Sequence, residues 1–271
     1  MNREVNMQNP DDIRKLVRNR YAQAATGSGC CGASAAGGCC GGDAAPPEAL
    51  AKLMGYGADE LRDGIQDANL GLGCGNPTAL GKLKSGETVL DLGSGGGIDC
   101  FLAARLVGED GCVIGVDMTP EMLAKARANA AKMQVENVSF RLGEIEHLPV
   151  ADSSVDVILS NCVINLSPQK EQVFREAFRV LKPGGRLAIS DVVATKEMPA
   201  EMRSQAALLT GCIAGAEVVD RLRSWMAAAG FVHIDIRTKT YSSELVSQWM
   251  PGTGVESFVA SADIEALKPR N

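Results

Sequence analysis

The sequence predicts an α/β fold with a Rossmann-like, doubly wound and mostly parallel sheet. Between residues 88 and 193, short apolar stretches that are typical of buried strands alternate with helical patterns. A glycine-rich turn, Asp91-Leu-Gly-Ser-Gly-Gly-Gly97, contains the end of the first of these strands. The second predicted strand leads to another carboxylate, Asp117. Ligands of such folds bind at the carboxyl ends of the strands, so both carboxylates are candidates for a binding site.

The individual elements follow from strand patterns and helix caps. Thr119-Pro120 and Ser167-Pro168 are typical helix starts, because a hydroxyl group can cap the first turn and proline suits its first position. Lys182-Pro183-Gly184-Gly185 ends a helix and turns the chain into the next strand. We expect strands at 88–92, 112–116, 137–142, 155–160 and 186–193, and helices at 97–107, 120–133 and 168–181.

The segments on either side of this alternation are less regular. One helix is expected from Pro10 to about Ala25 and another from Pro47 through Met54. Residues 26–46 between them are rich in glycine, alanine, serine and cysteine, so they cannot build a core and predict a flexible arm. In the last part of the chain we expect helices at 198–215 and 218–229 and strands at 231–240 and 258–266.

Composition excludes several classes of function. The net charge of −6, without any basic block, argues against a nucleic-acid surface. No apolar run approaches the length that spans a membrane, and the amino terminus has no apolar leader, so we expect a soluble, cytoplasmic protein without a membrane partner. In that compartment the nine cysteines predict reduced thiols that serve a metal, a metalloid or redox chemistry, rather than a disulfide framework.

The glycine-rich turn indicates which cofactor the sheet holds. Its spacing disfavours the dinucleotide fingerprint, because Ile98 stands where the third glycine belongs. The spacing Asp-x-Gly-x-Gly-x-Gly instead resembles motif I of S-adenosylmethionine-dependent methyltransferases. Asp117 then suits the ribose hydroxyls, and after the third strand Glu144 suits an adenine amino group while Ile145 packs on the ring. The predicted cofactor residues are Asp91, Gly93, Ser94, Gly95, Gly97, Asp117, Met118, Glu144, Ile145 and Asn161.

Cysteines are the second guide to function. Cys74 lies in a glycine-rich loop before the first strand, and Cys162 follows the fourth strand, at the edge of the sheet where ligands bind. Buried free cysteines are commonly structural, but this position favours a site for Cys162. Cys100 and Cys112 are interpreted as small core residues. Two Cys-Cys pairs, at 30–31 and 39–40, occupy the arm, where soft ligands are a better explanation than a plain linker.

Three cysteine motifs carry a family resemblance. The segments Asn-Leu-Gly-Leu-Gly-Cys74-Gly-Asn-Pro, Ser-Asn-Cys162-Val-Ile-Asn-Leu and Gly-Cys212-Ile-Ala-Gly-Ala, together with the turn after Asp91 and the tail Ser261-Ala-Asp-Ile-Glu-Ala-Leu-Lys-Pro, resemble arsenite S-adenosylmethionine methyltransferases. The resemblance covers nearly the whole chain. It implies arsenite and methylarsenite as substrates, with Cys74, Cys162 and Cys212 as thiolate ligands of trivalent arsenic, assisted by an arm cysteine such as Cys31 or Cys40.

The change of pattern along the chain also predicts a domain division, and further partners are expected. We expect an amino-terminal helix and cysteine-rich arm (1–45), an S-adenosylmethionine-binding domain (46–195) and a small α/β subdomain that covers the active site (196–271). An external thiol reductant of the thioredoxin or glutathione type is expected, and the protein is expected to act as a monomer.

The chemistry is consistent with these residues. Three soft thiolates suit a trivalent arsenic centre and leave its lone pair exposed to attack the methyl carbon of a sulfonium. No proton leaves this nucleophile, so no general base is needed, in agreement with a chain that has only two histidines. Two alternatives stay open: a methyltransferase for another small molecule, which leaves the three cysteines unexplained, and a cysteine-rich metal- or metalloid-binding protein. Two adjacent Cys-Cys pairs do not match the usual spacing of structural zinc sites.

Overall fold

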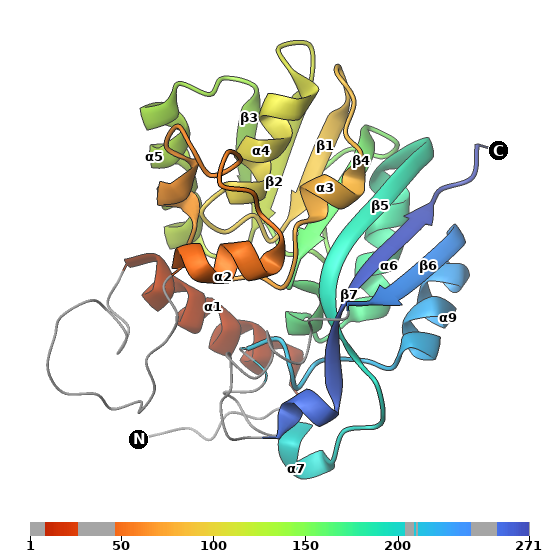
Figure 1. Cartoon of the computed structure of the whole chain (residues 1–271). Coiled ribbons are helices and arrows are strands. Elements are labelled where there is room, and N and C mark those ends of the chain that lie inside the picture. Colours follow the sequence, from red (N-terminus) through yellow and green to blue (C-terminus); the bar gives the residue numbers. More distant parts are fainter. Residues whose placement is uncertain (1–8, 27–46, 204–208, 210, 240–253, 271) are drawn as a thin grey trace, which may run out of the picture.

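The structure is a computed structural model that describes residues 9–26, 47–203, 209, 211–239 and 254–270. Its centre is a seven-stranded sheet in the order β3-β2-β1-β4-β5-β7-β6 (Figure 1). The first five strands in this order are parallel, whereas β7 runs antiparallel to both of its neighbours. The strands are β1 (Thr88–Leu92), β2 (Cys112–Asp117), β3 (Val138–Leu142), β4 (Val155–Asn161), β5 (Leu181–Ala194), β6 (Val232–Thr238) and β7 (Val259–Leu267).

Helices cover both faces of the sheet. Successive residues of one strand belong to different hydrophobic clusters, as Val89 and Leu90 do, because side chains alternate along a strand. Helices α2, α4 and α5 pack on one face, and α6 and α9 pack on the other. The helices are α1 (Pro10–Thr26), α2 (Pro47–Met54), α3 (Pro77–Gly81), α4 (Ile98–Val107), α5 (Pro120–Met133), α6 (Lys170–Val180), α7 (Ala200–Arg203) and α9 (Val219–Ala229). Short 3₁₀ helices are η1 (Ile65–Ala68), η2 (Ile164–Leu166) and η3 (Val255–Ser257).

The doubly wound, mostly parallel sheet is confirmed. Each expected strand and helix between residues 88 and 193 is present, with boundaries that differ by a few residues. The largest difference is β5, which begins at Leu181 rather than 186, because Leu181 pairs with Val155 before an irregularity in the register. Cys100 is buried as expected, but Cys112 is exposed at the start of β2, so its interpretation as a core residue is wrong.

The expected helix 198–215 is correct only in part for the residues that the structure describes, because Leu209 is helical but the end of the segment is not. Only α7 is helical within residues 198–203, and residues 211–215 form turns. One backbone angle and one close approach explain the turns. Cys212 has a φ of +64°, which a helix cannot contain. A Cβ at Gly215 would overlap the carbonyl oxygen of Asn165, so the backbone there lies directly against the loop after β4.

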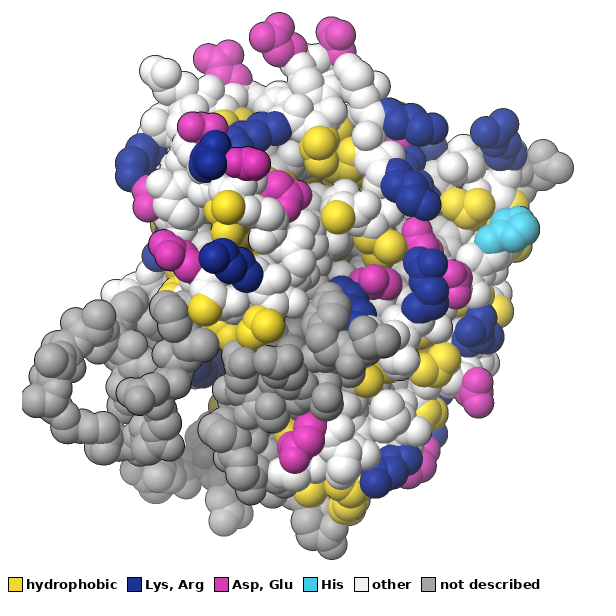
Figure 2. Space-filling view, in the orientation of Figure 1, with side chains coloured by type: hydrophobic (Ala, Val, Ile, Leu, Met, Phe, Trp, Pro, Cys, Tyr) yellow, Lys and Arg dark blue, Asp and Glu magenta, His cyan; other side chains and the backbone are white. Residues whose placement is uncertain are grey.

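The carboxyl-terminal strands join the central sheet. β7 pairs with β5 from Arg186 to Ala194, and β6 pairs with β7. The division into an arm, a central domain and a subdomain stays a prediction, and the arm at 27–46 lies outside the described residues. On the face shown in Figure 2, acidic and basic side chains are interspersed. None of the helices in the described part of the chain is long and apolar enough to cross a membrane.

Candidate active site

The glycine-rich turn follows β1 directly and leads into α4. Gly97 is the N-cap of α4 with a φ of +95°, and a Cβ there would lie 2.7 Å from the ring of Phe101. Only glycine fits both the conformation and the space. The amide of Gly95 donates to the Asp117 carboxylate at 2.9 Å, and the amide of Ser94 donates to the carbonyl of Val116 at 3.0 Å. The end of β2 therefore fixes the turn.

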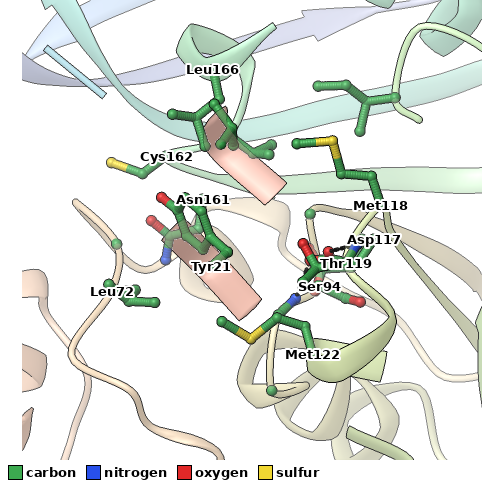
Figure 3. Close-up of a pocket in the computed structure, with 18 of the residues that line it drawn as sticks. Tyr21, Leu72, Ser94, Asp117, Met118, Thr119, Met122, Asn161, Cys162 and Leu166 are labelled. Atoms are coloured by element: carbon green, nitrogen blue, oxygen red, sulfur yellow. Dashed lines mark hydrogen bonds between the residues drawn. The ribbon is translucent and has the colours of Figure 1, made fainter. Parts of the chain in front are cut away.

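A cavity lies beside this turn, at the carboxyl ends of β1, β2 and β4; we call it the central cavity (Figure 3). Most of the predicted cofactor residues line it, which means that the carboxyl ends of the parallel strands bring them together as expected. The predicted residues in its wall are Asp91, Gly93, Ser94, Gly95, Asp117, Met118, Ile145, Asn161 and Cys162. Gly97 lies just behind the wall, as the cap of α4.

Glu144 is a predicted cofactor residue that does not line the central cavity. Its neighbours Gly143 and Ile145 line the central cavity, whereas its carboxylate pairs with the guanidinium groups of Arg14 at 3.3 Å and Arg18 at 3.6 Å. Both arginines belong to α1, so Glu144 holds this helix rather than facing the cavity. A contact of Glu144 with adenine stays a prediction.

Helix α1 closes one side of the central cavity with Arg14, Val17 and Tyr21. The guanidinium of Arg14 also donates to the Gln169 side chain at 2.7 Å. The helix lies across the end of the sheet at which β1 and β2 terminate (Figure 1). Sequence analysis missed these residues as site residues, because an amphipathic helix that lines a cavity has the same pattern as one that covers a core.

The central cavity is acidic. Asp91 and Asp99 are buried in or beside its wall, at 2% and 3% exposure. Burial raises the pKa of Asp91 well above its usual value, raises that of Asp99 to about 6, and raises that of Asp117. The buried hydroxyl of Ser94 has no hydrogen-bond partner within the described part of the chain. Desolvated carboxylates and a free hydroxyl group suit a ligand that carries positive charge and hydrogen-bonding groups.

Cys74, Cys162 and Cys212 gather on one side of this cavity, in one buried hydrophobic cluster; we call them the cysteine cluster. Cys74 and Cys162 are joined by a disulfide, with their Cα atoms 5.8 Å apart. The expectation of reduced thiols is therefore wrong for this pair in this structure: β4 and the loop before α3 bring the two sulfur atoms into bonding contact. The arm cysteines, Cys31 and Cys40 among them, lie outside the described residues.

Cys212 is a free, buried thiol that lies against the same pair. Its Sγ donates to the carbonyl of Cys162 at 2.7 Å, and it is also hydrogen-bonded to Tyr21. The side-chain nitrogen of Asn165 donates to the carbonyl of Cys212 at 3.1 Å, which ties the 211–215 turns to the loop after β4. Burial raises the pKa of the Cys212 thiol, so the folded protein disfavours its free thiolate.

Asp191 is a member of the site that sequence analysis missed. One of its carboxylate oxygens lies within 4.8 Å of the sulfur atoms of both Cys74 and Cys162. It accepts from the amides of Ile164 at 3.0 Å and Val192 at 2.7 Å, yet burial raises its pKa to about 7. Its place on β5, the fifth parallel strand of the alternation, near the edge that holds Cys162, is the signal that could have identified it.

The chain is similar to known proteins over most of its length. A family model described as "Methyltransferase domain" matches residues 83–230. An arsenite methyltransferase from Halobacterium salinarum is 52% identical over 264 residues, which cover 96% of this chain and 68% of that protein. One from Aquipseudomonas alcaligenes is 52% identical over 151 residues, covering 53% of this chain and 43% of that protein.

A solved structure is similar over most of the chain. It is an arsenic(III) S-adenosylmethionine methyltransferase from Chlamydomonas reinhardtii, with a TM-score of 0.60 and 33% sequence identity. The match covers 83% of this chain and 74% of that chain.

Proposed function

The chain belongs to the arsenite methyltransferase family, and we propose that it transfers a methyl group from S-adenosylmethionine to trivalent arsenic bound by its cysteine cluster. The observation that carries the proposal is the meeting of Cys74, Cys162 and Cys212 beside the central cavity. These residues come from three segments that are far apart in the sequence. A methyltransferase for an ordinary metabolite has no need of such a cluster.

The central cavity fits the cofactor. S-adenosylmethionine carries a positive sulfonium and a positive amino group, and the carboxylates of Asp91, Asp99 and Asp117 line the cavity. The cofactor would supply an activated methyl group. The protein orients it through the glycine turn and through Asp117, and α1 limits the access of water from one side.

The cysteine cluster prepares the nucleophile. Arsenic bound by three thiolates keeps a lone pair, which would form the bond to the methyl carbon while the carbon–sulfur bond of the sulfonium breaks, without the loss of a proton. S-adenosylhomocysteine would leave, and the arsenic, which becomes pentavalent, would need two electrons from a thiol reductant to return to the trivalent state. The disulfide between Cys74 and Cys162 must first accept two electrons and two protons to give two thiols. This requirement supports an external thiol reductant of the thioredoxin or glutathione type.

We also propose methylarsenite as a second substrate, and arsenic detoxification as the purpose of the reaction. A cytoplasmic location suits this chemistry, because thiol reductants keep cysteines reduced there. The direct test incubates the chain with arsenite, dithiothreitol and S-adenosylmethionine labelled in its methyl group, followed by separation of arsenic species. We expect label in methylated arsenic. Label that stays in the cofactor, while the reduced chain binds both ligands, would contradict the proposal.

A further inference from the structure

Asn161 makes a paired contact with the loop that carries Cys74. Its side-chain oxygen accepts from the backbone amide of Cys74 at 2.9 Å, and its side-chain nitrogen donates to the carbonyl of Gly75 at 2.8 Å. A single side chain therefore binds the backbone on both sides of the Cys74 Cα. Asn161 is the last residue of β4 and directly precedes Cys162.

Tyr56 and Asp99 fix the orientation of this amide. The nitrogen of Asn161 also donates to the hydroxyl of Tyr56 at 2.9 Å and lies 3.3 Å from a carboxylate oxygen of Asp99. The Tyr56 hydroxyl in turn donates to the other Asp99 oxygen at 2.7 Å. Tyr56 and Asp99 are both buried, at 4% and 3% exposure. A buried network in which every member is paired holds one geometry firmly.

The loop has little freedom on its other sides. A Cβ at Gly73 would lie 3.0 Å from the amide atoms of Asn161, so the backbone approaches this side chain closely. The hydroxyl of Ser261 on β7 donates to the carbonyl of Cys74 at 2.7 Å. Asn161 thus contacts the loop from the β4 side, and Ser261 binds it from the β7 side.

We propose that Asn161 is a positioning residue that holds Cys74 opposite Cys162, and that Tyr56 and Asp99 keep its amide in place. This role differs from the contact with the cofactor that the sequence predicts for Asn161. As a statement about arsenic chemistry it rests on the proposed function, because it makes Asn161 a residue that assembles the sulfur ligands. As a statement about the distance between two sulfur atoms it can be tested without arsenic.

The test measures how readily Cys74 and Cys162 pair in the full, folded chain. In glutathione buffers the protein dithiol and oxidised glutathione exchange to give the Cys74–Cys162 disulfide and two reduced glutathione molecules. Mass spectrometry of the peptides that carry these cysteines gives the equilibrium constant. We compare the wild type with Asn161→Ala and Tyr56→Phe. Asn137→Ala is the matched control, since Asn137 donates to the carbonyls of Ala104 at 3.2 Å and Gly108 at 3.0 Å, away from the cluster.

We expect the equilibrium constant to fall about tenfold in Asn161→Ala and roughly threefold in Tyr56→Phe, the sizes that follow from the loss of one or two hydrogen bonds. It should stay within about twofold of the wild type in Asn137→Ala, whose lost hydrogen bonds do not touch the loop. An unchanged constant in Tyr56→Phe and Asn161→Ala, with cooperative thermal unfolding retained, would overturn the proposal.

Two further readouts separate this role from others. Calorimetric titration should show the affinity for S-adenosylmethionine unchanged in Tyr56→Phe, while kcat/KM for arsenite falls more than kcat/KM for methylarsenite. A weakened cofactor affinity together with an unchanged disulfide equilibrium would make Asn161 a cofactor residue and overturn the proposal. If the wild type fails to methylate arsenite, the proposed function fails, and the glutathione measurement still decides the role of Asn161.

Discussion

The two sides of the active site are built in different ways. The cofactor side consists of the turn 91–97 and the end of β2 at Asp117, which are close in sequence and are joined by backbone amides. The cysteine side is assembled from Cys74, Cys162 and Cys212, and side chains such as Asn161 hold these segments together. The centre of the cofactor side is therefore a property of one supersecondary unit, although α1 and the end of β4 complete the cavity wall, whereas the cysteine side exists only in the complete fold.

The largest expected effects test whether the cysteine side alone decides the substrate. Arsenite offers three valences to sulfur and methylarsenite offers two, so the second substrate needs one cysteine fewer. Cys162→Ser and Cys212→Ser should abolish turnover of both substrates, because serine keeps the size but removes the soft ligand. Cys74→Ser should lose arsenite turnover and keep substantial methylarsenite turnover. If Cys162→Ser turned over either substrate at the wild-type rate, arsenic would have to bind elsewhere.

A second prediction concerns the independence of the cofactor side. Asp117→Ala removes the acceptor of the Gly95 and Thr119 amides and the expected partner of the ribose. It should weaken cofactor binding by about 1–3 kcal/mol in calorimetric titration and leave arsenite binding unchanged. The exposed Asp110, replaced by alanine, is the control. Equal cofactor affinity in Asp117→Ala and Asp110→Ala would remove Asp117 from the site.

A third prediction uses pH to examine the boundary between the two sides, where Asp99 meets Asn161. Burial raises the pKa of Asp99 to about 6, so the folded state keeps a proton that the unfolded state has lost. Stability should therefore fall as the pH rises from about 4 to 6, and this loss should remain at higher pH. Urea unfolding at pH 4 and pH 8 measures how much the free energy of unfolding falls between these values. This fall should be smaller in Asp99→Asn than in the wild type, by about 1–2 kcal/mol. An identical pH dependence in both proteins would contradict the raised pKa.

The smallest expected effect concerns the helix that touches both sides. Glu144→Gln weakens the pairs with Arg14 and Arg18, which are partly exposed, so it should reduce stability by less than about 1 kcal/mol. Cofactor affinity should change little if Glu144 serves only α1. A loss of affinity as large as that of Asp117→Ala would instead support the contact with adenine that the sequence predicts.

The same contrast explains what the sequence could predict. The turn after β1 and the carboxylate that follows β2 have local signatures in glycine spacing and strand patterns, so the cofactor side and the sheet were predictable. The residues that support the cysteines have no such signature. Nothing near Tyr56 indicates that its hydroxyl reaches Asp99 and Asn161, which lie 43 and 105 residues away in the sequence.

Sequence patterns were also misleading where packing overrides local preference. Residues 211–215 continue the predicted helix although Gly211 and Gly215 disfavour one. In the structure Gly215 lies against the Asn165 carbonyl and Cys212 adopts a left-handed conformation. The disulfide between Cys74 and Cys162 depends on the distance between two residues that are 88 positions apart in the sequence, and composition cannot predict this distance.

Helix α1 gives the two sides a common mechanical element. Arg14 and Val17 line the central cavity, and Tyr21, about two turns further along, is hydrogen-bonded to Cys212. A single helix that contacts both ligand sites is a route by which they can be thermodynamically linked. By reciprocity, any factor by which bound cofactor strengthens the capture of arsenic must equal the factor by which captured arsenic strengthens the retention of cofactor.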